Sequence, residues 1–330
     1  MMPATALDRR LALAHLPTPL EPMERLGPHL GMEPETLWVK RDDATGLAGG
    51  GNKARKLEFL CADALAQGCD TLVTGGGRQS NHVRMTAAAA NRLGLRCTVV
   101  LGSEEPTVPS GNVVLDELLA PEMVWRGALD YYGVEAAIED TCLRLEAEGR
   151  RPYRMPIGGA SAVGALGYVA AAHELVGQLP DVQLVVVADG SGGTHSGLVA
   201  GLGRHELVLG VDVGTRPDLD EQVPAKAAET AALAGLPPPA GQCQIDHDRF
   251  GPGYAAPTDE CREALDLAAR LEGLILDPVY SGKAMAGLIA ARRDERIGAD
   301  TRVVFLHTGG MPALFAAAYA DWIKRRPTSS

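Results

Sequence analysis

Short apolar runs and longer amphipathic stretches alternate along most of this chain. Residues 184–188 (LVVVA) form a continuous apolar, β-branched run, which is typical of a strand that is buried on both faces. In residues 53–67, apolar side chains recur three and four positions apart, which predicts an amphipathic helix. The same reasoning predicts strands over residues 36–41, 71–74, 96–101, 153–156, 184–188, 207–211 and 303–307. It predicts helices over residues 53–67, 81–93, 111–119, 135–147, 162–175, 259–271 and 284–293, one from residue 195 onward and one after residue 310. Residues 217–242, which are rich in Ala and Pro, are expected to form an exposed helix and a loop.

Glycine clusters follow several predicted strands and precede the next helices, at residues 75–77, 158–159, 190–193 and 309–310. Alternating strands and helices predict the α/β class with mostly parallel sheets. Open sheets of this kind bind ligands at the carboxyl ends of their strands, where glycine lets the backbone approach the ligand. We therefore expect a ligand site where these glycine turns come together.

The composition narrows the classes of function. The 330 residues include 31 Lys and Arg against 42 Asp and Glu, a net charge of -11, whereas nucleic-acid binding needs a basic face. No apolar run is long enough to span a membrane, and residues 1–20 lack the apolar centre of a signal peptide, so we expect a cytoplasmic protein. The six cysteines have no metal-ligand spacing, which favours buried thiols over disulfides and predicts no metal site.

Several common catalytic motifs are absent from the sequence. There is no GxSxG, no GxxxxGK[ST], no HExxH and no complete GxGxxG that opens a helix. Serine hydrolysis, zinc catalysis and dinucleotide binding are therefore disfavoured.

A lysine follows three glycines at the start of the first long predicted helix, in the motif GGGNK that ends at Lys53. The positive potential at a helix N-terminus favours the neutral amine of such a lysine. A neutral amine can form a Schiff base with an aldehyde cofactor. The alternative interpretation is a glycine turn that is followed by solvated helix lysines.

Two further helix starts have the features of anion sites. The turn GSGGTH over residues 190–195 offers unpaired N–H groups and hydroxyls that suit a monophosphate. Asp189 precedes this turn, and we expect its carboxylate to face away because it would repel an anion. The turn that ends in RQSNH places Ser80 as an N-cap and offers the N–H groups of Ser80, Asn81 and His82 to a carboxylate. Each turn could instead be purely structural.

Hydroxyl side chains near other predicted strand ends complete the candidate set, namely Tyr254, Tyr280, Ser281 and Thr308. Each of them alone is more often structural than catalytic. A lysine, a monophosphate cradle, a carboxylate cradle and phenols together describe a site for pyridoxal phosphate and an amino acid.

Six segments of the chain, in order, resemble the family of D-cysteine desulfhydrases and 1-aminocyclopropane-1-carboxylate deaminases. They are VKRDD at 39–43, GGNKARKLEF at 50–59, QSNH at 79–82, residues 190–197, residues 276–282 and HTGG at 307–310. The resemblance implies a fold-type II pyridoxal-phosphate enzyme, similar to the tryptophan synthase β subunit. Such enzymes have two open, twisted, mostly parallel sheets flanked by helices, with the cofactor in the cleft between domains. It further implies a large domain of residues 1–49 and 156–330, a smaller domain of residues 50–155 inserted into it, and a homodimer.

The same resemblance implies which residues hold the cofactor, pyridoxal 5'-phosphate. Lys53 would bind it covalently, and Asn81 would hold its ring oxygen. Either Ser281 or Thr308 would face the pyridine nitrogen. The phosphate would be held by Lys56, Gly192, Gly193 and Thr194.

The resemblance also implies how a small amino-acid substrate is bound. Ser80, Asn81 and His82 would bind its carboxylate. Tyr254 and Tyr280 would flank it as acid–base or positioning groups. No nucleic acid or membrane is expected as a partner.

The residue after Tyr280 guides the choice of reaction. The resemblance implies that deaminases which open the cyclopropane ring have a glutamate at the position after this tyrosine. That glutamate keeps the pyridine nitrogen of the cofactor protonated. This chain has Ser281 at the same position. A hydroxyl supports a weaker electron sink, which favours α,β-elimination from a β-substituted alanine. D-cysteine would then give pyruvate, ammonia and hydrogen sulfide. Deamination of 1-aminocyclopropane-1-carboxylate stays an alternative.

Two other reactions stay open. Arg78 lies two residues before the carboxylate cradle and would suit a sulfonate, so an L-cysteate sulfo-lyase is one alternative. Arg78 could instead be a solvated turn residue, or pair with a carboxylate across the domain interface. A cysteine-synthase-like β-replacement transferase is the other alternative, and it would need a second site for the nucleophile.

Overall fold

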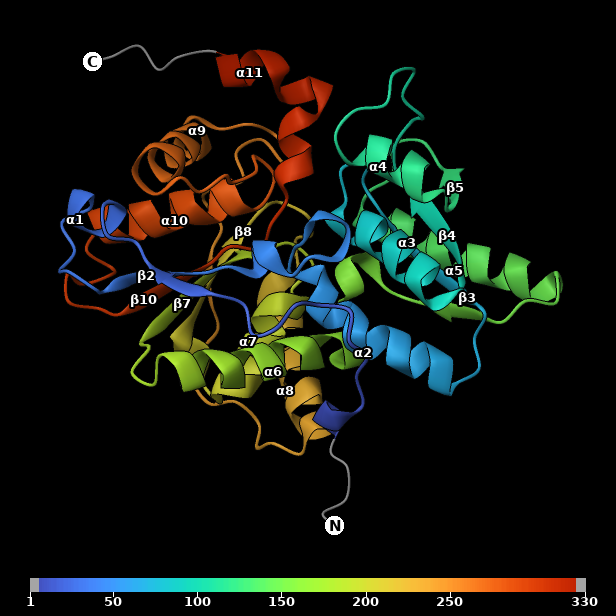
Figure 1. Cartoon of the computed structure of the whole chain (residues 1–330), viewed down its shortest axis with the longest axis horizontal. Helices are drawn as coiled ribbons and strands as arrows, with labels where there is room; N and C mark the ends of the chain where they lie inside the picture. Colours follow the sequence, from blue (N-terminus) through green and yellow to red (C-terminus); the bar gives the residue numbers. More distant parts are fainter. Residues whose placement is uncertain (1–5, 325–330) are drawn as a thin grey trace.

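The computed structural model describes residues 6–324 and contains two sheets, which lie on opposite sides of the view in Figure 1. The larger sheet has six strands in the order β1-β2-β10-β7-β8-β9, and the smaller has four in the order β5-β4-β3-β6. Only the pair β1–β2 is antiparallel among these strands. The predicted α/β class, with two open and mostly parallel sheets flanked by helices, is confirmed.

The strands of the larger sheet are β1 (Leu20–Pro22), β2 (Leu37–Lys40), β7 (Leu184–Asp189), β8 (Val208–Asp212), β9 (Gln244–Asp246) and β10 (Val303–Leu306). Those of the smaller sheet are β3 (Thr71–Gly76), β4 (Arg96–Leu101), β5 (Glu122–Trp125) and β6 (Pro152–Arg154). The helices are α1 (Leu26–His29), α2 (Lys53–Ala66), α3 (Asn81–Leu93), α4 (Asn112–Leu119), α5 (Tyr131–Ala147), α6 (Ala162–Gln178), α7 (Gly193–Leu202), α8 (Leu219–Ala234), α9 (Asp259–Leu267), α10 (Ser281–Arg293) and α11 (Ala320–Lys324).

Both faces of the larger sheet are buried, because its side chains alternate between two apolar clusters. Val186 and Phe305 pack with α9 and α10 on one face. Val185 and Val304 pack with α6, α7 and α8 on the other face. This alternation explains why the central strands read as continuous apolar runs in the sequence.

The smaller sheet is covered in the same way. Leu72 and Val99 face a cluster with α2 and α3, whereas Val73 and Val100 face α5. Helix α2 also packs against α6 beside the larger sheet, so it contacts elements on both sides of the molecule. The division into a large domain of residues 1–49 and 156–330 and a smaller domain of residues 50–155 stays a prediction. Residues 1–5 and 325–330 of the predicted large domain lie outside the described residues.

Most predicted elements form within a few residues of their expected bounds. The bounds of β4 (Arg96–Leu101) are the same as the predicted ones. The short elements β1, β5, β9 and α1 were not predicted, because three or four residues carry too little periodicity. The predicted last helix is broken into 3-10 turns at Met311–Phe315 and Ala317–Tyr319, followed by α11. A proline stands at the second position of the first of these turns.

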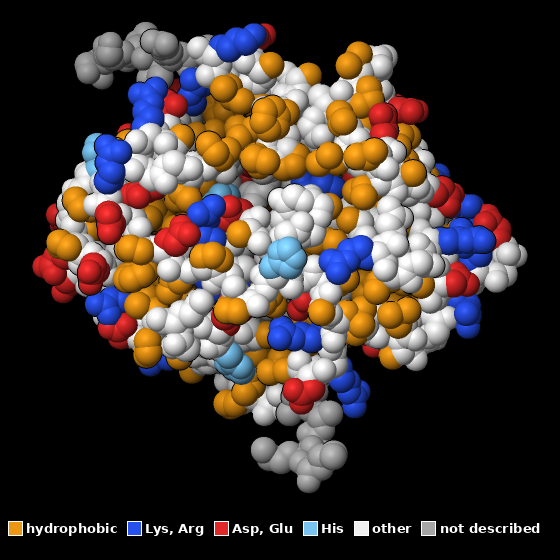
Figure 2. All heavy atoms as spheres, in the orientation of Figure 1, with side chains coloured by type: hydrophobic (Ala, Val, Ile, Leu, Met, Phe, Trp, Pro, Cys, Tyr) orange, Lys and Arg blue, Asp and Glu red, His pale blue; other side chains and the backbone are white. Residues whose placement is uncertain are grey.

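The surface mixes charges of both signs. Figure 2 shows acidic and basic side chains interspersed on one face, with apolar side chains gathered near its top. Within residues 6–324, no helix combines the length and apolar character that crossing a membrane requires. All six cysteines are free thiols, and Cys61, Cys97, Cys142 and Cys261 are buried.

A buried charge network attaches α2 to the larger sheet. The Arg55 guanidinium donates to Asp42 on one side and to both carboxylate oxygens of Glu174 in α6 on the other, at 2.9–3.0 Å. Lys40 of β2 donates to Glu174 Oε1 at 2.5 Å, and Tyr168 donates to Asp42 Oδ2 at 2.6 Å. Breaking a buried pair by removing one partner typically costs about 3–5 kcal/mol, because the other charge stays buried.

The pH dependence of stability tests this network through Glu174. Burial raises the pKa of this carboxyl, but hydrogen bonds and charges from Arg55 and Lys40 lower it from 4.5 to about 2. Since the folded pKa lies below the unfolded one, the stabilisation is present above pH 4.5 and is lost as the pH falls towards 2. We expect urea unfolding to lose up to ~3 kcal/mol over this range in the wild type and clearly less in Glu174→Gln.

Glu148→Gln is the matched control, because Glu148 is the exposed C-cap of α5 and its one ion pair among residues 6–324 is with Arg144, one turn earlier. We expect it to keep the wild-type pH profile, since exposed pairs contribute little. Equal losses of stability in the wild type and Glu174→Gln would contradict the assignment.

Candidate active site

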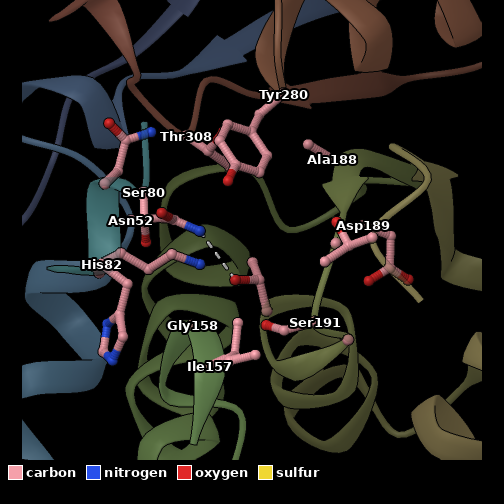
Figure 3. A pocket seen from close by; sticks show the side chains of 16 residues that line it. Asn52, Ser80, His82, Ile157, Gly158, Ala188, Asp189, Ser191, Tyr280 and Thr308 are labelled. Atoms are coloured by element: carbon pink, nitrogen blue, oxygen red, sulfur yellow. Dashed lines mark hydrogen bonds between the residues drawn. The ribbon is translucent and has the colours of Figure 1, made fainter. Parts of the chain in front are cut away.

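The main cavity lies where the carboxyl ends of β3, β7 and β10 meet the start of α2. Residues from both sheets line it, as Figure 3 shows with Ser80 and His82 on one side and Asp189 and Ser191 on the other. The lining residues are Asn52, Lys53, Ser80, Asn81, His82, Ile157, Gly158, Ala188, Asp189, Gly190, Ser191, Gly192, Thr194, Thr215, Tyr280 and Thr308. The structure thus brings together most of the residues that the sequence singled out.

Lys53 is the first residue of α2 and follows a sharply bent glycine loop. Gly49, Gly50 and Gly51 all have positive φ, and a Cβ on Gly50 would lie 1.9 Å from the carbonyl oxygen of Asp43. Only glycine fits there, so the loop fixes where the helix starts. Burial lowers the pKa of Lys53 to about 8, partly opposed by the charge of Asp189. A substantial fraction of the amine is therefore neutral near pH 8, as a nucleophile for an aldehyde requires.

The turn between β7 and α7 forms an anion cradle. Gly192 is the N-cap of α7 with φ 83°, and the main-chain N–H groups of the first turn have no partner within the helix. Thr194 Oγ1 accepts a hydrogen bond from Asn52 Nδ2 at 3.0 Å. A Cβ on Gly193 would lie 2.8 Å from Lys56 Nζ, so this amino group lies directly against the turn.

Lys56 and Gly193 border the cradle without lining the cavity itself. Lys56 is fully buried, and its Nζ donates to the carbonyl oxygen of Gly158 at 3.1 Å. Burial, together with the charge of Lys53, places the pKa of Lys56 well below its ordinary value. A bound phosphate dianion would restore the charged form of this side chain, which is a physical reason for an anion to bind here.

His82 supplies an independent test of what the cavity holds. Its side chain is buried, and neither ring nitrogen has a hydrogen-bond partner among the described residues. Burial and the charges of Lys53 and Lys56 lower its pKa well below the ordinary value, so the ring is neutral. Buried polar atoms without partners are rare in folded proteins, and they indicate a ligand or water. The donor set therefore fits a phosphate-bearing aldehyde such as pyridoxal phosphate.

Ser80 is the N-cap of α3, as predicted from its position before the helix. Its backbone is extended, and its Oγ accepts a hydrogen bond from the N–H of Val83 at 3.3 Å. The hydroxyl proton stays available to a ligand in the cavity. Asn81 also faces the cavity, and its Oδ1 accepts hydrogen bonds from Arg84 and Asn112.

Tyr254 and Tyr280 form a pair whose hydroxyls contact each other. Tyr280 lines the main cavity, while Tyr254 lines an adjoining cavity that also includes Ser80, Gly77 and Tyr280. Burial raises the pKa of Tyr254 to about 12 and raises that of Tyr280 well above its ordinary value. Both phenols therefore stay protonated at neutral pH.

Ser281 and Thr308 are placed differently. Ser281 Oγ donates to Asp277 Oδ1 at 2.6 Å and accepts from the N–H of Asp277 at 2.8 Å, so its hydroxyl is used at the start of α10. Thr308 lines the cavity, and its carbonyl oxygen accepts from the N–H of Asn52 at 3.0 Å. Of the two residues expected at the pyridine nitrogen, Thr308 is the one with access to the cavity.

Arg78 does not line the main cavity. It is exposed and lines a neighbouring pocket with Tyr254 and Tyr319, and it has no hydrogen bond or ion pair within residues 6–324. No prediction named Asn52, Ile157 or Thr215 as lining residues. Asn52 was recoverable because it lies within the glycine–lysine motif, whereas the other two depend on tertiary packing.

Asp189 lines the cavity through its position at the end of β7. Its carboxylate Oδ2 is bound to His195 Nδ1 at 2.7 Å, and both side chains are buried. We expected this carboxylate to face away from the cradle; the structure holds it on His195 of the helix that follows, while Asp189 still lines the cavity.

Comparison with known proteins places this site in a family. A family model described as pyridoxal-phosphate dependent enzyme matches residues 11–309. The chain belongs to this family of pyridoxal-phosphate-dependent enzymes. The D-cysteine desulfhydrases of Salmonella typhi and Salmonella newport are each 46% identical to it over 331 residues, which is 96% of this chain and 98% of each relative.

Solved structures agree with this membership. The crystal structure of an ACC deaminase homologue is 36% identical, covers 96% of this chain and 95% of that chain, and has a TM-score of 0.87. Threonine deaminase isoform 2 from Solanum lycopersicum and a pyridoxal 5'-phosphate-dependent aspartate racemase, each 17% identical, share the fold with TM-scores of 0.66 and 0.65. Pyridoxal 5'-phosphate is therefore the cofactor of this enzyme.

Covalent labelling tests the role of Lys53. We expect the purified enzyme to absorb visible light and to lose this absorbance in Lys53→Ala, because we predict that the Lys53 amine binds the cofactor aldehyde. Borohydride reduction of the wild type followed by peptide mapping should place the label on Lys53. A label on another lysine would contradict the assignment, and the alternatives are Lys40, Lys56, Lys226, Lys283 and Lys324.

Proposed function

We propose that this enzyme catalyses α,β-elimination from a β-substituted alanine, and that D-cysteine is its substrate. D-cysteine and water would give pyruvate, ammonia and hydrogen sulfide. The identity of 46% to D-cysteine desulfhydrases over 96% of the chain supports this substrate. The proposal for the reaction type rests on the geometry of the cavity.

The observation that carries the reaction type is the lack of a free carboxylate among the residues that line the main cavity. Asp189 is the only acidic residue in that lining, and its carboxylate is bound to His195 at 2.7 Å. Ser281 stands where a carboxylate would be expected for ring opening, and Thr308 offers only a hydroxyl. A cavity that offers the cofactor a hydroxyl and no free carboxylate supports a weaker electron sink, which suffices for a good β leaving group.

The chain's own side chains have distinct roles in this proposal. Lys53 holds the cofactor, which supplies the electron sink for chemistry at the α-carbon of the amino acid. Ser80 and the N–H groups at the start of α3 bind the substrate carboxylate. Tyr280, with Tyr254 behind it, holds a proton at its hydroxyl next to the cavity. The phosphate cradle at α7 is formed by Gly192, Gly193 and Thr194, with Lys56 against it.

A substrate panel tests the function directly. We expect keto acid and ammonia to be released from D-cysteine and β-chloro-D-alanine, with at least tenfold lower kcat/KM for L-cysteine, L-cysteate and 1-aminocyclopropane-1-carboxylate. Release of keto acid without an added nucleophile separates elimination from β-replacement. Turnover of the cyclopropane amino acid at a rate similar to that of D-cysteine would contradict the proposal.

Arg78 favours a second candidate, an L-cysteate sulfo-lyase. Its guanidinium is exposed beside Tyr254 in the pocket next to the main cavity, and the described residues give it no ion pair. A guanidinium without a carboxylate partner is a suitable donor for a sulfonate.

The homodimer that the family resemblance implies stays a prediction.

The effect of Arg78→Ala on two substrates distinguishes these candidates. A hydrogen bond to a charged group is worth about 1.5–3 kcal/mol, and exposure places the expected loss at the lower end, about tenfold in KM. If Arg78 binds a sulfonate, KM for L-cysteate rises by this factor and KM for D-cysteine does not. Arg96→Ala is the matched control, because Arg96 is exposed at the other end of the smaller sheet. An equal rise of KM for L-cysteate and for D-cysteine in Arg78→Ala would remove the support for a sulfo-lyase.

A further inference from the structure

Asn81 is held in one orientation by two donors. Its Oδ1 accepts from Arg84 Nη1 at 3.0 Å and from Asn112 Nδ2 at 3.1 Å. An arginine side chain has no acceptor, so the atom that faces Arg84 has to be the amide oxygen. The NH₂ group of Asn81 is therefore turned away from Arg84, and no described residue accepts a hydrogen bond from it. Asn81 lines the cavity beside Lys53.

The two donors are themselves fixed. Arg84 is fully buried, and its Nη2 donates to the carbonyl oxygen of Gly50 in the loop that precedes Lys53. Asn112 is also fully buried, its Oδ1 accepts from Arg84 Nη1 at 2.5 Å, and its Nδ2 donates to the carbonyl oxygen of Gln79 at 2.9 Å. If the Asn81 amide were flipped, its NH₂ group would face the Arg84 donor. If the Asn112 amide were flipped, its NH₂ group would face Arg84 and its oxygen would face the carbonyl oxygen of Gln79.

The arginine at the centre of this cluster remains a cation. Burial lowers the pKa of Arg84 to about 10, opposed by the charges of Asp116 and Asp277, so the guanidinium is charged at neutral pH. A cation that donates to an amide oxygen polarises the amide, which makes its N–H groups better donors. The cluster thus both orients and strengthens the donor that Asn81 presents to the cavity.

We propose that Arg84 and Asn112 are positioning residues that turn the NH₂ group of Asn81 towards an oxygen acceptor of the bound cofactor. This inference rests on the cofactor and on Asn81 as one of its ligands, and it does not depend on the substrate. It also connects three segments that are distant in the sequence, because Arg84 contacts the glycine loop, the start of α3 and the start of α4.

The isosteric variant Asn112→Asp tests the orientation. It keeps an acceptor for Arg84 but replaces the donor to Asn81 by an oxygen, which favours the flipped amide of Asn81. We expect the dissociation constant of pyridoxal phosphate, titrated into apoenzyme by absorbance, to rise about tenfold, as for the loss of one hydrogen bond. Asn81→Ala should give a similar rise, and the double variant should bind no more weakly than Asn81→Ala.

Two comparisons separate orientation from general loosening. Asn112→Ala leaves Arg84 as a donor to Asn81 and should raise the dissociation constant about twofold at most. Asn91→Asp is the matched control at the far end of α3, where the exposed Asn91 donates to the carbonyl oxygen of Leu119. We expect it to bind the cofactor like the wild type.

The outcomes are distinct. Wild-type affinity in Asn112→Asp, with weakened binding in Asn81→Ala, would overturn the positioning role. Equal losses in Asn112→Asp and Asn112→Ala would show a loosened loop and also overturn it. Additive losses in the double variant would do the same. Wild-type affinity in Asn81→Ala would show that Asn81 is not a cofactor ligand, a result that leaves the proposed elimination of D-cysteine untouched.

The visible spectrum gives a second readout. A hydrogen-bond donor at a cofactor oxygen shifts the absorbance maximum of the bound cofactor. Asn112→Asp and Asn81→Ala should therefore shift it in the same direction, while Asn91→Asp leaves it in place. Opposite shifts in the first two variants would contradict a shared cause.

Discussion

Parallel strands bring their carboxyl ends, and the N-termini of the helices that follow them, to one edge of a sheet. In this enzyme two such edges face the same cavity, one with β3 and α3 and the other with β7 and α7. Each helix start contributes unpaired N–H groups, so the cavity has anion-binding donors on two sides. Lys53 opens a third helix between them, and burial among these donors lowers its pKa to about 8. The chemistry of the site follows from this arrangement.

Two buried arginines hold the segment that carries Lys53. Arg55 attaches α2 to Asp42 and Glu174 beside the larger sheet. Arg84 reaches from α3 to the carbonyl oxygen of Gly50 in the loop before α2. A guanidinium offers several donors in a rigid plane, so each arginine can join segments that no apolar contact could fix so closely. The lysine is thereby positioned against both sheets.

The cavity is rich in neutral donors and poor in free carboxylates. Asp189 is bound to His195, Ser281 is bound to Asp277, and the tyrosine pair stays protonated because of burial. Such surroundings suit an anionic ligand, and the residues that line the cavity offer it no free carboxylate. This pattern agrees better with the loss of a good leaving group than with the opening of a cyclopropane ring.

The alternation of strands and helices, the glycine turns, Lys53 at a helix start and Ser80 as an N-cap could all be predicted from the amino-acid sequence. These features depend on local spacing and backbone conformation, which neighbouring residues decide. Tertiary structure alone decided that Arg78 lies outside the main cavity, that Thr308 rather than Ser281 faces it, and which way the amide of Asn81 points. These depend on contacts between segments far apart in the chain, such as Asn81 with residue 112, and only the packing of the two sheets sets those distances.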